Sequence, residues 1–345
     1  MDVKPTSPWK ASTSDRIREA AFFFGSIALT YGLVAVTGFE GKLAYFIIFF
    51  IVYAIATSLF SFFKFGSATA KDSAVKVVIA CGALLTLIPI ASILGTVISK
   101  GYKGIKPNIF VNDMSLATPT DALTNGGLLH AIVGTLIMIA GALILSVPIG
   151  ILTALYLTEI KGAFTRPIRF LVQAMSGVPS IVAGLFILSA VVYPITKSTS
   201  GFVGSLALSI LMIPTVARTS EEVLNLIPQD LREAGTALGG TQWRTVAMIV
   251  IPAAKSGLFT AVILGVARIA GETAPLLLLT GGGDRLNANL FNDPMGSLPF
   301  YIWKSFLAGS EEAITRAWAG LLVLVALILI LFTTARFLST RKVSR

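Results

Sequence analysis

The chain has 345 residues, of which 55% are hydrophobic and 13% are charged, and its mean hydropathy is +0.84. This composition is too apolar for a water-soluble domain of that length, so it excludes the soluble function classes. The net charge of +10 does not indicate a nucleic-acid-binding surface. Most Lys and Arg fall in loops expected on the cytoplasmic side of a membrane, where positive residues are normally in excess. The sequence predicts an all-α polytopic protein of the cell membrane, in contact with lipid and with no nucleic acid partner.

Apolar runs long enough to cross a bilayer as helices recur along the chain. We predict about eight spans, with both termini cytoplasmic, over 18–38, 43–63, 75–98, 128–157, 168–193, 203–217, 256–280 and 316–338. The short run 203–217 contains Pro214 and is expected to continue as a helix beyond the membrane surface. The only cysteine, Cys81, is expected to pack in its span, and the only histidine, His130, to lie at the membrane interface, so no metal site is predicted.

Two domains are expected along the chain. A first domain, 1–66, would hold a cytoplasmic leader and a transmembrane hairpin, and the polar stretch 64–76 would be a linker. A second domain, 67–345, would hold six spans and two external loops, 99–127 and 281–315.

The stretch 218–255 is too polar to span a bilayer and too helix-prone to be a slack loop. Pro228 can start a short helix over 229–239, and Gly239 and Gly240 can end it. Such a helix at the cytoplasmic face suits docking into a soluble partner, although an amphipathic loop resting on lipid headgroups fits the pattern equally well. The chain has no GxxxxGK[ST] motif, so any ATP that drives it would bind to another subunit.

Part of this stretch resembles the EAA motif of ABC importer permeases. The matching residues are Glu233, Ala234, Gly235, Gly239, Ile249, Ile251 and Pro252. The sequence departs from the motif in having Gly235 in place of alanine and Ile251 in place of leucine. Four further segments resemble the PstA family of phosphate importer permeases: "GVPSIVAGLF" (177–186), "ARIAGETAPLLL" (267–278), "SLPFYIW" (297–303) and "AWAGLLVL" (317–324). The resemblance covers about 75–338 and leaves the N-terminal hairpin unexplained.

The resemblance implies a permease subunit of an ATP-driven phosphate importer, with an importer permease core of six helices after the extra hairpin. The helix 229–239 would be the coupling helix, which contacts the ATPase through Glu233, Ala234, Gly235 and Gly239. The implied partners are a PstC-like permease subunit, a PstB-like ATPase dimer and a PstS-like phosphate-binding protein. The chain itself would be no enzyme and would need no cofactor, because ATP is hydrolysed in the partner.

The segment "ARIAGETAPLLLLT" (267–280) places two charges in an apolar run. In a continuous helix over 256–280, Arg268 would lie near the middle of the membrane, where a charge costs about 2.5–3.5 kcal/mol, and Glu272 would neutralise it at i+4. Charges at that depth usually face a water-filled path, and the planar guanidinium suits phosphate. A structural staple between helices is the alternative.

Arg218, at the inner end of its span, is a second candidate for the path. It could also pair with Glu221 or Glu222, or simply extend toward the membrane surface. Pro179 is expected to break the helix of the span 168–193. Three other functions fit parts of the pattern: a permease for another oxyanion such as sulfate or molybdate, a secondary transporter or channel without an ATPase, and a membrane sensor or scaffold.

Overall fold

The structure, a computed structural model, describes residues 13–39 and 41–341, and no side chain of Asp15 or of 338–341. The predicted cytoplasmic leader up to residue 12 and the last four residues of the tail lie outside the described residues. The described part is helical, with an isolated bridge between Gly281 and Met295 as its β-type pairing, so the predicted all-α fold is confirmed. Seven helices are long and apolar enough to cross a membrane, and a bent pair can supply an eighth span.

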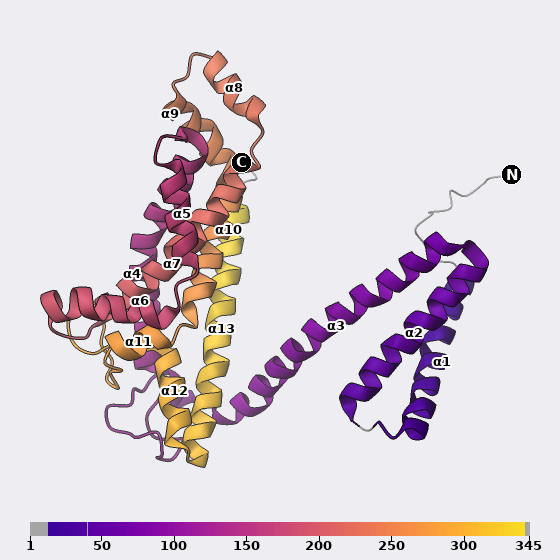
Figure 1. Cartoon of the computed structure of the whole chain (residues 1–345). Coiled ribbons are helices and arrows are strands. Elements are labelled where there is room, and N and C mark those ends of the chain that lie inside the picture. Colours follow the sequence, from indigo (N-terminus) through magenta and orange to yellow (C-terminus); the bar gives the residue numbers. More distant parts are fainter. Residues whose placement is uncertain (1–12, 40, 342–345) are drawn as a thin grey trace. The chain divides into compact units, whose positions relative to one another are not determined.

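The chain forms two compact units, Met1–Gly95 and Thr96–Arg345. The first unit contains α1 (Thr13–Thr37), α2 (Lys42–Phe65) and most of α3 (Ser67–Gly101) (Figure 1). Helices α1 and α2 form the predicted hairpin and pack through aromatic rings, with the Phe22 and Phe60 centroids 5.2 Å apart. The division after residue 66, which separates the hairpin from a permease module, stays a prediction.

The predicted linker over 64–76 is wrong. Only Gly66 interrupts the helices there, with a φ of 90°, and α3 begins at the next residue. The stretch is polar but rich in Ala and Lys, which are good helix formers, so its polarity does not make it irregular.

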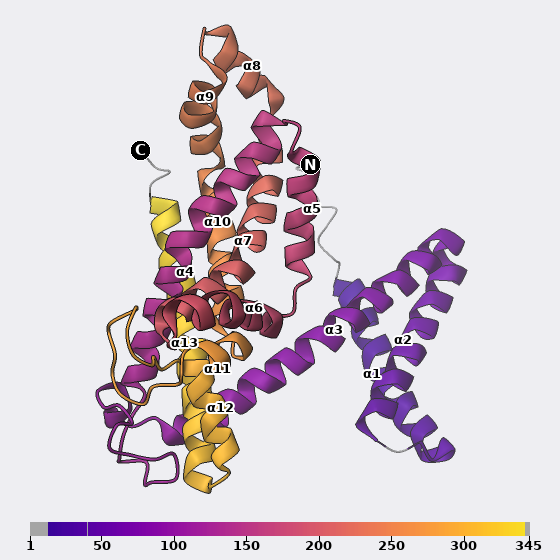
Figure 2. The ribbon, with the colours of Figure 1, turned by 60° about the vertical axis from the view of Figure 1, so that its left-hand side comes forward.

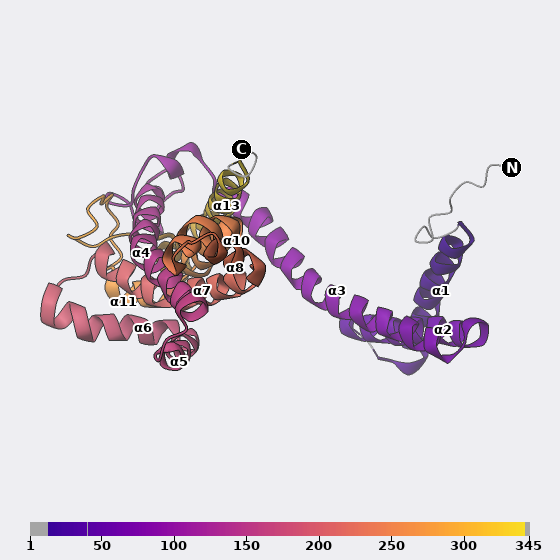
Figure 3. The same ribbon diagram turned by 90° about the horizontal axis from the view of Figure 1, so that it is seen from above.

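The second unit is built on four helices that lie side by side, as Figure 3 shows almost end on. They are α4 (Leu129–Leu155), α7 (Gly201–Asn225), α10 (Ile251–Ala270) and α13 (Glu311–Arg341). Glycines let α7 approach its neighbours closely: a Cβ on Gly150 of α4 would lie 2.8 Å from Val216, and one on Gly265 of α10 would lie 2.8 Å from Met212. Helix α7 continues well beyond residue 217, as predicted.

The predicted span 168–193 is not a continuous helix. It consists of α5 (Thr165–Ser176) and α6 (Ser180–Ile187), which continues as a π-helix over Leu188–Thr196, and the two parts are bent by 105°. The bend falls at Pro179, as predicted, because proline lacks an N–H and keeps the residue before it out of the helical conformation. Figure 1 shows α6 running across the bundle.

The predicted span 256–280 is also broken. Helix α10 ends at Ala270, and a short helix, α11 (Ala274–Leu279), follows after three residues. Gly271 and Pro275 explain the break, since neither favours a helix interior. The two broken segments meet, because a Cβ on Gly184 of α6 would lie 2.8 Å from Cα of Pro275.

The bundle has a different structure at each end, as Figure 2 shows. One end carries α8 (Gln229–Ala237) and α9 (Gln242–Thr245). At this end a π-helical segment, Tyr156–Ile160, extends α4, and another, Val246–Val250, leads into α10. The other end carries two short 3₁₀ segments, Tyr102–Gly104 and Pro107–Phe110, and α12 (Leu298–Ala308).

The loops beside α12 are joined by hydrogen bonds. The Met114 N–H donates to the Asp284 carbonyl at 2.9 Å, and the Leu286 N–H donates to Oδ2 of Asp113 at 2.9 Å. His130 is buried against the Tyr301 ring at this end of α4, with 2% of its surface exposed, and its place at the membrane interface stays a prediction.

Candidate functional site

Arg268 and Glu272 do not form the pair predicted from their spacing. Arg268 lies exposed in the last turn of α10, whereas Glu272 lies half-buried beyond the end of that helix. Because Gly271 ends the helix, the two side chains do not share one helical face. Among the described residues, no ion pair joins them.

The end of α10 is nevertheless a favourable place for a cation. The last carbonyls of a helix carry a partial negative charge, so an arginine in the final turn is stabilised there. The break also brings polar backbone groups into an apolar segment, which is tolerated in a membrane where protein or water can satisfy them. The exposed guanidinium of Arg268 at this break can therefore receive an anion through paired N–H donors.

Arg218 lies apart from Arg268. It is exposed near the end of α7, which the segment 226–250 joins to the start of α10, whereas Arg268 lies at the far end of α10. Among the described residues, no ion pair joins Arg218 to Glu221 or Glu222, the predicted alternatives, and Arg169 of α5 binds Glu221, with Nη2 2.6 Å from Oε1. Whether Arg218 contributes to a path stays a prediction.

The predicted helix over 229–239 is present as α8. Pro228 stands just before it, and Gly239 follows it in the left-handed conformation, with a φ of 81°. Glu233 and Ala234 are exposed, so they can face a partner.

Gly235, by contrast, is buried against the chain that returns to the membrane. A Cβ on Gly235 would lie 2.6 Å from Cγ2 of Thr245 and 2.8 Å from Cδ1 of Ile249. This contact explains why glycine replaces the alanine of the EAA motif.

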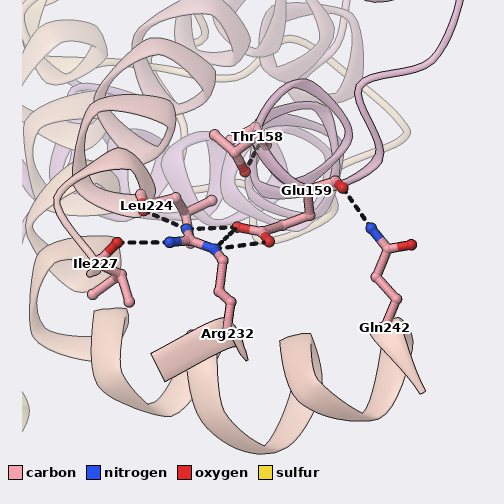
Figure 4. Close-up of polar contacts among 7 residues, drawn as sticks. Thr158, Glu159, Leu224, Ile227, Arg232 and Gln242 are labelled. Carbon is pink, nitrogen blue, oxygen red and sulfur yellow. Dashed lines mark hydrogen bonds and ion pairs between the residues drawn. The ribbon is translucent and has the colours of Figure 1, made fainter. Parts of the chain in front are cut away.

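An ion pair that no sequence pattern predicts holds α8 in place (Figure 4). Arg232 of α8 donates from Nη2 to Oε1 of Glu159 at 2.8 Å, and its Nε lies 3.1 Å from Oε2 of the same carboxylate. Both side chains are largely buried, with 17% of Arg232 and 7% of Glu159 exposed. Gln242 of α9 also donates to the Glu159 carbonyl at 2.6 Å.

One sequence signal could have suggested this pair. Glu159 ends an apolar run on the side where the coupling loop is expected, and Arg232 lies within that loop. Their separation of 73 positions gives no local pattern, so only the fold brings them together. Among the residues described, no group of three metal-ligating side chains could hold a metal ion.

Residues 146–344 match the family model for the binding-protein-dependent transport system inner membrane component, a segment that includes the coupling loop and both broken helices. The chain belongs to this permease family. It is therefore a multi-pass membrane protein, and the N-terminal hairpin lies outside the segment that the family model matches.

Relatives of this permease include two named phosphate transport system permease protein PstA. The protein from Mycobacterium leprae is 38% identical over 266 residues, which cover 76% of this chain and 87% of the relative. The protein from Pasteurella multocida is 38% identical over 252 residues, covering 72% and 88%. Among solved structures, the inward-facing MetNI methionine ABC transporter is similar with a TM-score of 0.49 and 20% identity, over 64% of this chain and 95% of that one.

Proposed function

We propose that this permease is one of two membrane subunits of an ATP-driven importer of inorganic phosphate. The observation that carries the proposal is the identity of 38% over about three quarters of the chain with PstA permeases named for phosphate transport. The exposed guanidinium of Arg268 at a broken apolar helix is consistent with an anionic substrate.

In this proposal Arg268 binds phosphate transiently on the path. Glu272 lies four residues further on, beyond the helix end, and would act on the anion rather than on Arg268 directly. It would accept a proton from the phosphate or weaken its binding by repulsion, since a path must release its cargo. A second permease subunit, PstC-like, would supply the other half of the path.

The chain would catalyse no reaction of its own. A PstB-like ATPase dimer would grip α8 through Glu233 and Ala234, and its closure on ATP would drive the change of access. A PstS-like protein would deliver phosphate to the end of the unit that carries α12.

The experiment that tests the path is uptake of labelled phosphate by cells that express the chain with its cognate subunits. Arg268→Gln removes charge-assisted hydrogen bonds worth about 1.5–3 kcal/mol, which corresponds to roughly ten- to a hundred-fold weaker uptake. Lys255→Gln, in the same helix, is the matched control and is expected to keep uptake within about twofold, since Lys255 is half-buried near the other end of α10 and forms no ion pair among the described residues. If the Arg268→Gln variant assembles normally and takes up phosphate as fast as the parent, Arg268 does not bind phosphate on the path and its role is structural.

Two alternative functions are separated by the same assay. A permease for sulfate or molybdate would lose phosphate uptake when excess unlabelled oxyanion is added. A secondary transporter or channel would continue to transport when the ATPase is inactivated, and it would have no use for the exposed residues of α8.

A further inference from the structure

The side chain of Arg232 connects three segments that are distant in the sequence. It belongs to α8, it binds Glu159 at the end of α4, and it donates to two carbonyls at the end of α7 (Figure 4). We propose that Glu159 and Arg232 are positioning residues that fix the coupling helix to the ends of α4 and α7, so that movement of α8 is passed to both helices.

Each of the three side-chain nitrogens of Arg232 donates at least one hydrogen bond in this arrangement. Its Nη1 donates to the Ile227 carbonyl at 2.6 Å, and Nη2 donates to the Leu224 carbonyl at 2.9 Å as well as to Glu159. The Leu224 carbonyl belongs to the last turn of α7 and the Ile227 carbonyl lies just beyond its end, so the guanidinium is fixed to the end of α7 while its Nε and Nη2 bind the carboxylate. A lysine could not reproduce this fork of donors.

Glu159 is held from two directions. Its carboxylate accepts from Arg232, and its backbone carbonyl accepts from Gln242 at 2.6 Å, so α8 and α9 are both fixed to the same residue. The loop is further located by Gly235, which fits closely against Thr245 and Ile249. The helix α8 therefore has contacts on both sides and cannot shift without moving α4 and α7 or breaking a buried ion pair.

A second ion pair in the chain offers a matched control. Arg169 and Glu221 have the same chemistry and a similar distance of 2.6 Å, and they join α5 to α7 without touching α8. The Arg169 side chain is 46% exposed, against 17% for Arg232. Exposed ion pairs contribute little, whereas removing one partner of a buried pair leaves an uncompensated charge.

The first test is a distance measurement that does not depend on transport. Spin labels are placed at L238C, beyond α8, and L152C, on α4, in the assembled complex with C81S; both label positions are well exposed. The distance distribution is expected to be narrow in this parent and at least twofold wider in E159Q and R232Q, and unchanged in E221Q. An E159Q distribution as narrow as the parent's would overturn the proposal.

A double variant guards against misfolding of the single ones. E159L with R232M removes both charges, so no buried charge is left alone and the complex is expected to assemble. Its distance distribution is expected to be as wide as that of E159Q. A narrow distribution in this double variant would also overturn the proposal.

The second test measures coupling, and it rests on the proposed function of α8. In proteoliposomes, E159Q is expected to hydrolyse ATP within twofold of the parent but to import at least tenfold less phosphate for each ATP hydrolysed. Equal losses of hydrolysis and import would contradict a positioning role. If the parent complex imports no phosphate with ATP, the proposed function fails, and the distance measurement still decides whether Glu159 and Arg232 hold α8.

Discussion

Replacing Gly184 with alanine tests whether the two broken segments must pack closely. The added Cβ would lie 2.8 Å from Cα and 3.2 Å from Cβ of Pro275, the second residue of α11. Carbon atoms in contact are separated by about 3.5 Å or more, so α6 and α11 must move apart by roughly 0.7 Å. The nearest atom belongs to the backbone of Pro275, which cannot rotate away as a flexible side chain could.

Overpacking of this kind costs about 1–3 kcal/mol. In a unit of this size, we expect G184A to lower the melting temperature of the purified complex by about 2–12 °C and to reduce phosphate uptake. The matched control is G82A in α3, because a Cβ there would meet no atom within 4 Å and the residue lies inside a helix, away from the broken segments. If G184A melts and transports like the parent, α6 and α11 do not depend on close contact, and the reasoning is refuted.

Three further predictions concern other parts of the permease. G239V is expected to lose about 1–2 kcal/mol of stability, because Gly239 has a left-handed φ of 81° and a Cβ there would meet no atom, so the backbone conformation is the whole cost. G239N should lose less stability, and thermal melting measures both variants. R316A should destabilise the end of the bundle that carries α12 by about 1–3 kcal/mol, because Arg316 is buried and Nη2 donates to the carbonyls of Asp121, Ala122 and Asn125. Protease cleavage of loop 117–127 in R316A should exceed that in the R285A control. Burial raises the pKa of Asp113, but hydrogen bonds from Ser115 and the Leu286 N–H outweigh it and lower the pKa below its ordinary value. The stability this gives is present above about pH 4 and is lost as the pH falls through the lower folded value, so melting of D113N should depend less on acid than that of the parent.

The sequence predicts the hairpin and the helix α8 well, because both depend on local signals. Apolar runs mark α1 and α2, and the proline before α8 and the glycine after it bound a segment of good helix formers. The break at Pro179 is also a local consequence of proline chemistry.

The arrangement of the charged residues at the candidate site is harder to predict from the sequence. The prediction that Arg268 and Glu272 share a helical face requires a continuous helix, whereas Gly271 and Pro275 together break it between Ala270 and Ala274. The pairing of Glu159 with Arg232 and of Arg169 with Glu221 depends on how separate helices end beside one another. No periodicity in one sequence carries that information.

We propose that this permease carries phosphate and that ATP hydrolysis drives the transport. The most direct measurement is uptake of labelled phosphate into proteoliposomes that contain the chain with its permease, ATPase and binding-protein partners, with ATP supplied on the ATPase side. We expect uptake that requires ATP, stops with an ATPase variant unable to hydrolyse it, and resists excess sulfate. Phosphate uptake that continues without ATP hydrolysis, or that sulfate abolishes, would contradict the account.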